Sequence, residues 1–242
     1  MHEQDNESEP YLGPEPEPEA PPTLIERAQQ APITSLLIAI DVLVFIAMSV
    51  QGDSTENRTL IAFGASARTL VLDDGEWWRL GSSMFLHIGI MHLLMNSWAA
   101  FSVGGGVEPR LGKLKYLGVY LAAGISGAAA STIYRNVLSA GASAANIGTV
   151  GAMLILRQRE LGAWGALVRD GFAKRVFLNV ALWTLFASQA LNVDNAAHLG
   201  GFVIGAALTW GLTAPERSAR IRDTALAVLA FATLTMAAIQ PW

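Results

Sequence analysis

Apolar residues run along the chain in blocks that are separated by shorter polar stretches. Seven such blocks cover roughly residues 33–50, 84–104, 114–133, 142–156, 175–191, 196–213 and 223–240. Blocks close to 20 residues long match the length of an α-helix that crosses the hydrocarbon core of a bilayer. The pattern therefore predicts an all-α, polytopic membrane protein with seven apolar helices.

Three segments depart from this simple pattern. The block 142–156 is too short to span a bilayer alone, so we expect its outer end to open into a cavity. The long loop 51–83 contains "EWWRL", an aromatic and arginine cluster typical of a membrane interface. Residues 157–174 include a short amphipathic piece, "ELGAWGALV".

Composition agrees with a membrane protein. Hydrophobic residues make up 52% of the chain and charged residues 15%, whereas soluble domains carry about a quarter charged residues. Seven of the 20 acidic residues lie in the first 19 positions, so residues 1–31 are expected to form an acidic, Pro-rich, disordered tail. The absence of cysteine excludes thiol catalysis and disulfides. Because basic stripes with aromatic residues are missing, nothing in the sequence supports nucleic-acid binding.

Lysine and arginine positions predict the orientation, since cytoplasmic loops carry the excess of these residues. With a cytoplasmic N-terminus, 12 of the 16 basic residues lie on the cytoplasmic side. The four on the other side are Arg58, Arg68, Arg79 and Arg135. The sequence therefore predicts a multi-pass membrane protein with a cytoplasmic N-terminus, and we expect a bacterial inner membrane.

With this orientation, the blocks 84–104, 142–156 and 196–213 all begin at the outer face. His92, Asn96, Ser143 and His198 then lie within one to three turns of that face. A lone Ser in a membrane helix usually bonds to its own backbone, and a lone His is usually a packing residue. Four such residues at one depth favour a functional site instead. His87, at the mouth of its helix, fits a structural role and a catalytic role equally well.

These residue types can carry out nucleophilic chemistry. His198 could accept the proton of the Ser143 hydroxyl and so activate it as a nucleophile. His92 and Asn96 are spaced i and i+4, so both can donate hydrogen bonds from one helix face. Small residues on the predicted helices 142–156 and 196–213 indicate a close contact between their backbones, which would bring Ser143 and His198 together. On the helix 196–213 they are Gly200, Gly201 and Gly205, and on the helix 142–156 they are Ala144, Gly148 and Gly151.

At these residues the sequence resembles the rhomboid family of intramembrane serine proteases. The matching motifs occur in family order over roughly residues 33–213. They are "WWRL" (77–80), "HIGIMHLLMN" (87–96), "GGGVEPRLG" (104–112), "GASA" (141–144) and "AAHLGGFVIG" (196–205). The resemblance implies a six-helix transmembrane bundle over residues 32–213, followed by a linker and a seventh transmembrane helix over 214–242.

The resemblance also implies roles for individual residues. Ser143 would be the nucleophile and His198 the general base of a dyad without a carboxylate. An oxyanion hole would consist of His92, Asn96 and the Ser143 backbone N–H. Structural support would come from Trp78, Arg79, Gly200 and Gly201, with Glu108 and Arg110 bracing the region between the helices 84–104 and 114–133. The implied function is cleavage of transmembrane segments of membrane proteins near the extracytoplasmic face.

Two other function classes stay open. The family usually has Gly directly after the serine and an aromatic residue four positions after it, whereas this chain has Ala144 and Ile147. Asn146 is a further unusual polar residue in that turn. A catalytically weak or inactive rhomboid-like protein that binds transmembrane helices is therefore the main alternative. A small transporter would require inverted repeats or broken helices with paired charges, which the sequence lacks.

No cofactor or metal site is expected, because "VGGGVE" lacks the strand and spacing of a phosphate-binding loop. The expected partners are transmembrane protein substrates and the lipid bilayer. The sequence leaves the oligomeric state and the identity of the substrate undetermined.

Overall fold

A computed structural model of the chain describes residues 23–135, 137–190 and 194–214. Within these ranges every regular element is a helix, and one isolated antiparallel bridge joins Ser66 to Ser139. The long helices are α2 (Pro32–Gln51), α5 (Gly89–Leu111), α6 (Lys113–Tyr134), α7 (Ser143–Leu161), α9 (Gly171–Ala190) and α10 (Asn195–Leu212). The short ones are α1 (Leu24–Gln30), α3 (Asn57–Phe63), η1 (Thr69–Asp73), α4 (Arg79–Ser82), η2 (Ser83–Phe85) and α8 (Trp164–Arg169).

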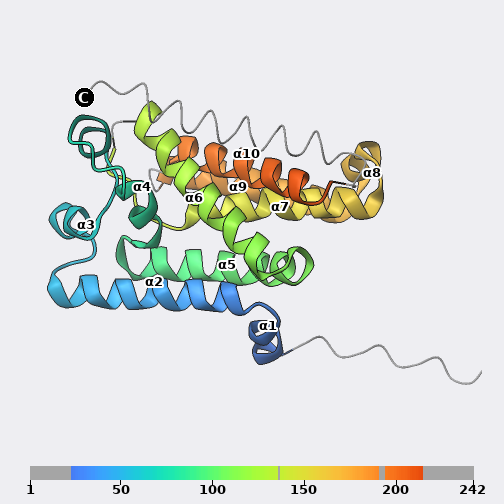
Figure 1. Cartoon of the computed structure of the whole chain (residues 1–242), viewed down its shortest axis with the longest axis horizontal. Coiled ribbons are helices and arrows are strands. Elements are labelled where there is room, and N and C mark those ends of the chain that lie inside the picture. The colour runs from blue at the N-terminus through green and yellow to red at the C-terminus, as the bar shows by residue number, and fades with distance from the viewer. Residues whose placement is uncertain (1–22, 136, 191–193, 215–242) are drawn as a thin grey trace, which may run out of the picture.

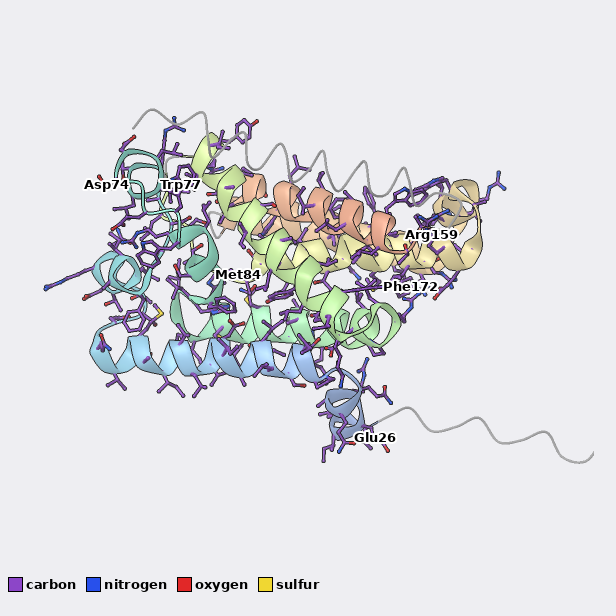
Figure 2. The ribbon with its side chains drawn as sticks, in the orientation of Figure 1. Glu26, Asp74, Trp77, Met84, Arg159 and Phe172 are labelled. Atoms are coloured by element: carbon purple, nitrogen blue, oxygen red, sulfur yellow. The ribbon has the colours of Figure 1, made fainter. Side chains whose placement is uncertain are left out.

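The helices form one bundle in which α6 runs obliquely between two groups (Figure 1). On one side α2 lies along α5, and on the other α10 packs against both α6 and α7. The helices α5, α7 and α10 all begin at the same end of the bundle, near α3 and α4. Figure 2 places Asp74 and Trp77 at that end and Arg159 and Phe172 at the opposite end, beside α8.

Two of the described helices, α2 and α6, are each long and apolar enough to cross a membrane. A third apolar stretch, Arg79–Phe85 followed by Gly89–Leu111, meets the same criterion as a pair but is bent by 94°. This confirms a membrane-type, all-α fold. The predicted seventh helix, 223–240, and residues 1–22 of the predicted tail lie outside the described residues.

Several predicted boundaries were wrong. The block 84–104 was expected to be one helix, but α5 begins only at Gly89, after the bend, and continues to Leu111. The block 142–156 was expected to be too short to span a bilayer, yet α7 continues to Leu161 and has 19 residues. Polar residues in its last turns, such as buried Gln158, hid this extension from a search for apolar runs. The loop 51–83 contains α3, η1 and α4.

Local sequence signals explain three helix ends. Pro32 occupies the first turn of α2, where its missing N–H and its fixed φ fit a helix start. Gly162 ends α7 in the left-handed conformation, with a φ of 74°. Asp194 caps α10, because its side chain accepts a hydrogen bond from the Ala197 N–H at 3.1 Å.

The N-terminus of α2 is capped by a residue of another helix. The flanking residue Ala31 offers no side-chain acceptor. The buried carboxylate of Glu108, from the last turns of α5, accepts from the N–H groups of Ile33 (2.9 Å) and Thr34 (2.8 Å). It also accepts from the Thr34 hydroxyl at 2.9 Å. Glu108 therefore satisfies N–H groups that a helix leaves free at its start, and it fixes α2 against α5.

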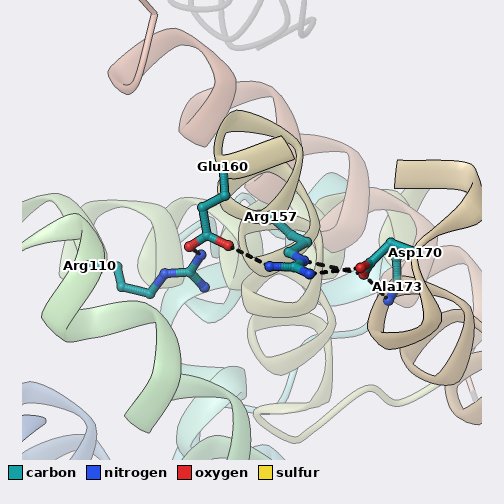
Figure 3. Close-up of polar contacts among 5 residues, drawn as sticks. All are labelled: Arg110, Arg157, Glu160, Asp170 and Ala173. Carbon is teal, nitrogen blue, oxygen red and sulfur yellow. Dashed lines mark hydrogen bonds and ion pairs between the residues drawn. The ribbon is translucent and has the colours of Figure 1, made fainter. Parts of the chain in front are cut away.

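A chain of ion pairs joins helices at the same end of the bundle as Glu108 (Figure 3). Arg110 of α5 pairs with Glu160 of α7, and Arg157 of α7 bonds both to Glu160 (3.1 Å) and to Asp170 (2.7 Å). Hydrogen bonds from the Arg157 guanidinium lower the pKa of Asp170 to about 2. Asp170 also accepts from the Ala173 N–H at 2.9 Å, which links the network to the first turn of α9.

We predict that Glu108→Ala lowers the free energy of unfolding by about 3 kcal/mol, because it leaves buried N–H groups of α2 without an acceptor. Arg110→Ala is the matched control, since it removes a partly exposed ion pair worth at most about 1 kcal/mol. Thermal unfolding in detergent measures both changes. Equal shifts for the two variants would contradict the capping role of Glu108.

Candidate active site

The contact between α7 and α10 is made largely by backbone atoms. A methyl group added to Gly201 would collide with the carbonyl oxygen of Ala144, and one added to Gly205 would collide with that of Gly148. On the α7 side of the same contact, a methyl group added to Gly148 would lie 2.8 Å from the Gly201 carbonyl oxygen of α10. The predicted small-residue contact is present, and it joins the start of α7 to the first turns of α10.

Gly200 does not belong to this contact, which corrects one predicted pairing. A methyl group on Gly200 would lie 2.9 Å from the Ala130 Cβ atom and 3.0 Å from the Ser126 carbonyl oxygen, both on α6. Successive residues on a helix are rotated by about 100°, so adjacent glycines face different neighbours. Gly200 thus allows α10 to pack closely against α6, while Gly201 allows it to pack closely against α7.

A third close contact accommodates Ala144. A methyl group on Gly127 of α6 would collide with the Ala144 Cβ atom and would lie 2.7 Å from the Ala197 carbonyl oxygen. The methyl group of Ala144 therefore occupies space that Gly127 leaves free. This contact draws α6, α7 and α10 together beside Ser143.

The segment that leads into Ser143 is held from two sides. Ser139 forms the bridge to Ser66 through reciprocal backbone hydrogen bonds of 3.0 and 2.7 Å. The Gly141 N–H then donates to the Ser83 carbonyl oxygen at 2.9 Å. These bonds fix the backbone immediately before α7 to the segment that links α2 to α5.

Gly141 also brings the His92 ring close to Ser143. Its φ of +130° suits only glycine, and a methyl group there would lie 2.6 Å from the His92 Cε1 atom and 3.0 Å from Nε2. The Ile88 N–H donates to His92 Nδ1 at 3.2 Å. In a neutral ring the proton is therefore on Nε2, which makes the nitrogen that faces Gly141 a hydrogen-bond donor.

Asn96 lies one turn beyond His92 on α5 and is buried. Its Nδ2 atom donates to the His92 carbonyl oxygen at 3.0 Å. From α7, the Asn146 Nδ2 atom donates to both the carbonyl oxygen and the Oδ1 atom of Asn96, each at 3.1 Å. The side chains of Asn96 and Asn146 thereby join α5 to α7 within one turn of Ser143.

His198 is buried on the first turn of α10, and its Nδ1 atom has no hydrogen-bond partner among the described residues. Its backbone N–H donates to the Asp194 carbonyl oxygen at 3.1 Å. Asp194 in turn accepts a hydrogen bond from the Ser131 hydroxyl of α6. In the described part of the chain no hydrogen bond joins Ser143 to His198, although Gly201 places α10 against Ala144, the neighbour of Ser143.

Arg79 and His87 are two further residues that the sequence singled out. Arg79 is buried and donates to the carbonyl oxygens of Ile61 (2.7 Å) and Ala65 (3.2 Å), while its guanidinium lies 4.6 Å from the Trp78 ring. It therefore fixes α4 to the end of α3. His87 is fully buried, and its ring centroid is 5.3 Å from that of His92.

Glu108 and Arg110 were expected to brace one region together, but the structure gives each a different partner. Glu108 binds the start of α2 and Arg110 pairs with Glu160 of α7. Both lie at the end of the bundle opposite to Ser143. They therefore act on the bundle and not on the site directly.

Sequence reasoning missed Asp194, Ser131 and Gly127. An Asp directly before an apolar helical run is a helix-start signal, so the role of Asp194 as a cap was detectable. Ser131 and Gly127 carry no such signal, because their partners, Asp194 for Ser131 and Ala144 and Ala197 for Gly127, belong to other parts of the chain.

Residues 74–215, more than half of the chain, match the family model described as Rhomboid domain. The chain belongs to the rhomboid family. The match includes Ser143, His198, His92 and Asn96, as well as the glycines of the contact between α7 and α10.

Named relatives agree with this assignment. The chain is 37% identical to Rhomboid protease GluP of Bacillus subtilis, over 82% of this chain and 38% of the relative. It is 29% identical to Rhomboid protease AarA of Providencia stuartii, over 84% of this chain and 80% of the relative. It is 30% identical to Rhomboid-like protease 2 of Toxoplasma gondii, over 61% of this chain and 52% of the relative. The chain thus spans well under half of the length of GluP.

We predict that Gly201→Ala destabilises this rhomboid protein by about 3 kcal/mol, because the new methyl group meets a backbone carbonyl that cannot move aside. Gly118→Ala on α6 is the control, since nothing lies within 4 Å of its added methyl group. A helical Ala is favoured over Gly, so this control is expected to gain about 0.5–1 kcal/mol. Thermal unfolding in detergent distinguishes the two, and a stable Gly201→Ala protein would contradict the close contact.

Proposed function

We propose that this rhomboid protein is an intramembrane serine endopeptidase that uses Ser143 as nucleophile and His198 as general base. The observation that carries the proposal is the backbone contact of Gly201 and Gly205 with the start of α7, because it holds the two helices with Ser143 and His198 together. The protease names of the relatives give independent support.

In the proposed reaction, His198 accepts the proton of the Ser143 hydroxyl while Oγ attacks the carbonyl carbon of the scissile peptide bond. The tetrahedral intermediate collapses as the C–N bond breaks, and the His198 imidazolium gives its proton to the leaving amine. A water molecule, deprotonated by His198, then attacks the acyl ester and releases the second product. Ser143 is only partly buried, which suits access of both substrate and water.

Three donors would stabilise the oxyanion of the intermediate. The first is the Ser143 backbone N–H, which belongs to the first turn of α7 and so has no acceptor within the helix. The others are His92 Nε2 and the second N–H of Asn96 Nδ2. Removal of one such donor typically costs about a hundredfold to a thousandfold in rate.

The proposed substrates are transmembrane segments, cut near the extracytoplasmic end of the bundle. Peptide hydrolysis needs water, which the bilayer core lacks, and α5, α7 and α10 bring the site residues to one end of the bundle. A helical substrate hides its carbonyl groups in hydrogen bonds, so substrates with Gly or Pro near that end are favoured. We further propose a bacterial inner-membrane location, a cytoplasmic N-terminus and six helices plus a seventh.

A non-cleaving rhomboid that binds transmembrane helices is the second candidate. One observation favours it, namely the lack of a hydrogen bond between Ser143 and His198 in the described part of the chain. Catalytic hydrogen bonds often form only in the substrate complex, so this observation does not outweigh the first. Reaction of Ser143 with a fluorophosphonate separates the two candidates.

We predict that the wild-type protein is labelled by a fluorescent fluorophosphonate and that Ser143→Ala and His198→Ala each abolish labelling. The residues of a dyad act as one unit, so the double variant is expected to be no worse than either single variant. Peptide mapping identifies the labelled residue. Labelling of the Ser143→Ala protein at the wild-type rate would contradict the proposed nucleophile.

The orientation is testable because the chain contains no cysteine. We predict that a membrane-impermeant maleimide labels an Asp74→Cys protein from the extracytoplasmic side and a Lys113→Cys protein only after the membrane is opened. Both positions are exposed; Asp74 lies at the end of the bundle where α5 begins (Figure 2), and Lys113 follows the other end of α5. Labelling of both from one side would overturn the proposed topology.

A further inference from the structure

Asn146 is a buried polar residue that the proposed reaction does not use. It lies three positions after Ser143 on α7, so the two side chains share one face of the helix. It is 4% exposed, and its Nδ2 atom reaches two oxygen atoms of Asn96 on α5. Its own Oδ1 atom is buried and has no partner among the described residues.

Backbone atoms determine how both amides are oriented. The Asn146 atom that faces the Asn96 carbonyl oxygen must be the NH₂ group, because a carbonyl oxygen can only accept. By the same reasoning, the Asn96 atom that faces the His92 carbonyl oxygen must be Nδ2. Asn96 Oδ1 is then the atom that faces Asn146, in agreement with the 3.1 Å bond between them.

These bonds hold the side-chain amide of Asn96 in one orientation and use only one of the two N–H groups of its Nδ2 atom. One hydrogen on Asn96 Nδ2 goes to His92, and the other is available for the oxyanion. The bond from Asn146 keeps Oδ1 occupied on the far side of the amide. Without it, a buried Oδ1 would lack a donor, and the Asn96 side chain would gain by turning toward a different one.

We propose that Asn146 is a positioning residue that orients Asn96 as an oxyanion donor. This inference rests on the proposed serine-protease function, and Asn146 itself touches no reacting atom. Asn146 also carries an unpartnered buried oxygen, which lowers stability. Replacement by an apolar side chain of similar size removes that oxygen together with the bond to Asn96, so it is expected to slow the reaction without lowering stability.

The test uses the full-length protein in detergent and measures the kinetics of fluorophosphonate labelling at Ser143. The phosphoryl oxygen of the probe occupies the place of the oxyanion, so the maximal labelling rate reports the donors and the half-saturating concentration reports binding. Asn146→Leu and Asn146→Ala are each expected to lower the maximal rate about tenfold with the half-saturating concentration unchanged. The midpoint of thermal unfolding of Asn146→Leu is expected to equal or exceed that of the wild type.

Two comparisons separate positioning from a general structural effect. Thr149→Val is the matched control, because it removes another buried polar group of α7, a hydroxyl that donates to the Ala145 carbonyl oxygen of its own helix. This variant is expected to label at the wild-type rate. In the Asn96→Ala background, Asn146→Leu is expected to cause no further loss, since the group that it positions is already absent.

The outcomes are distinct. Wild-type labelling rates in both Asn146 variants, or a further tenfold loss in the Asn96→Ala background, would overturn the positioning role alone. A loss in Asn146→Ala but not in Asn146→Leu would also overturn it, because the effect would then follow side-chain volume and not the donor. A wild-type protein that is not labelled at Ser143 would overturn the proposed function and this inference with it.

Discussion

The close approach of α10 to α7 is the constraint on which the rest of the site depends. Gly201 and Gly205 leave no side chain between the two helices, so backbone carbonyl groups of α7 touch the α10 helix directly. A contact of this kind tolerates little rotation or sliding of either helix, because even one methyl group cannot be accommodated. It therefore fixes the separation and register of the helices that carry Ser143 and His198.

The elements around this contact fix the same region from other directions. Gly127 makes room on α6 for Ala144, and Ser131 of α6 bonds to the Asp194 cap of α10. On the opposite flank, Ser139 and Gly141 are bonded to the segment before α5. The chain thus holds the start of α7 through backbone contacts, which are more rigid than contacts between flexible side chains.

Polar groups are also paired across helices where the bundle is buried. Glu108 supplies the acceptors that the start of α2 lacks, and Arg79 donates to backbone carbonyl groups at the end of α3 and just beyond it. Unpaired backbone groups are costly in an apolar environment, so such side chains stabilise the ends of helices. The amide pair of Asn96 and Asn146 follows the same principle within the site, and there it also directs a hydrogen-bond donor.

The sequence by itself determined the helical, membrane-type fold and the short list of chemically capable residues. Apolar run length and the i, i+4 spacing of His92 and Asn96 are local properties, so they could be read without coordinates. Only the tertiary structure decided that Gly200 faces α6 while Gly201 faces α7, that Glu108 caps α2, and that Asn146 bonds to Asn96. The physical reason is that the rotation of each helix about its axis is set by packing between residues about 50 to 75 positions apart, which no local pattern encodes.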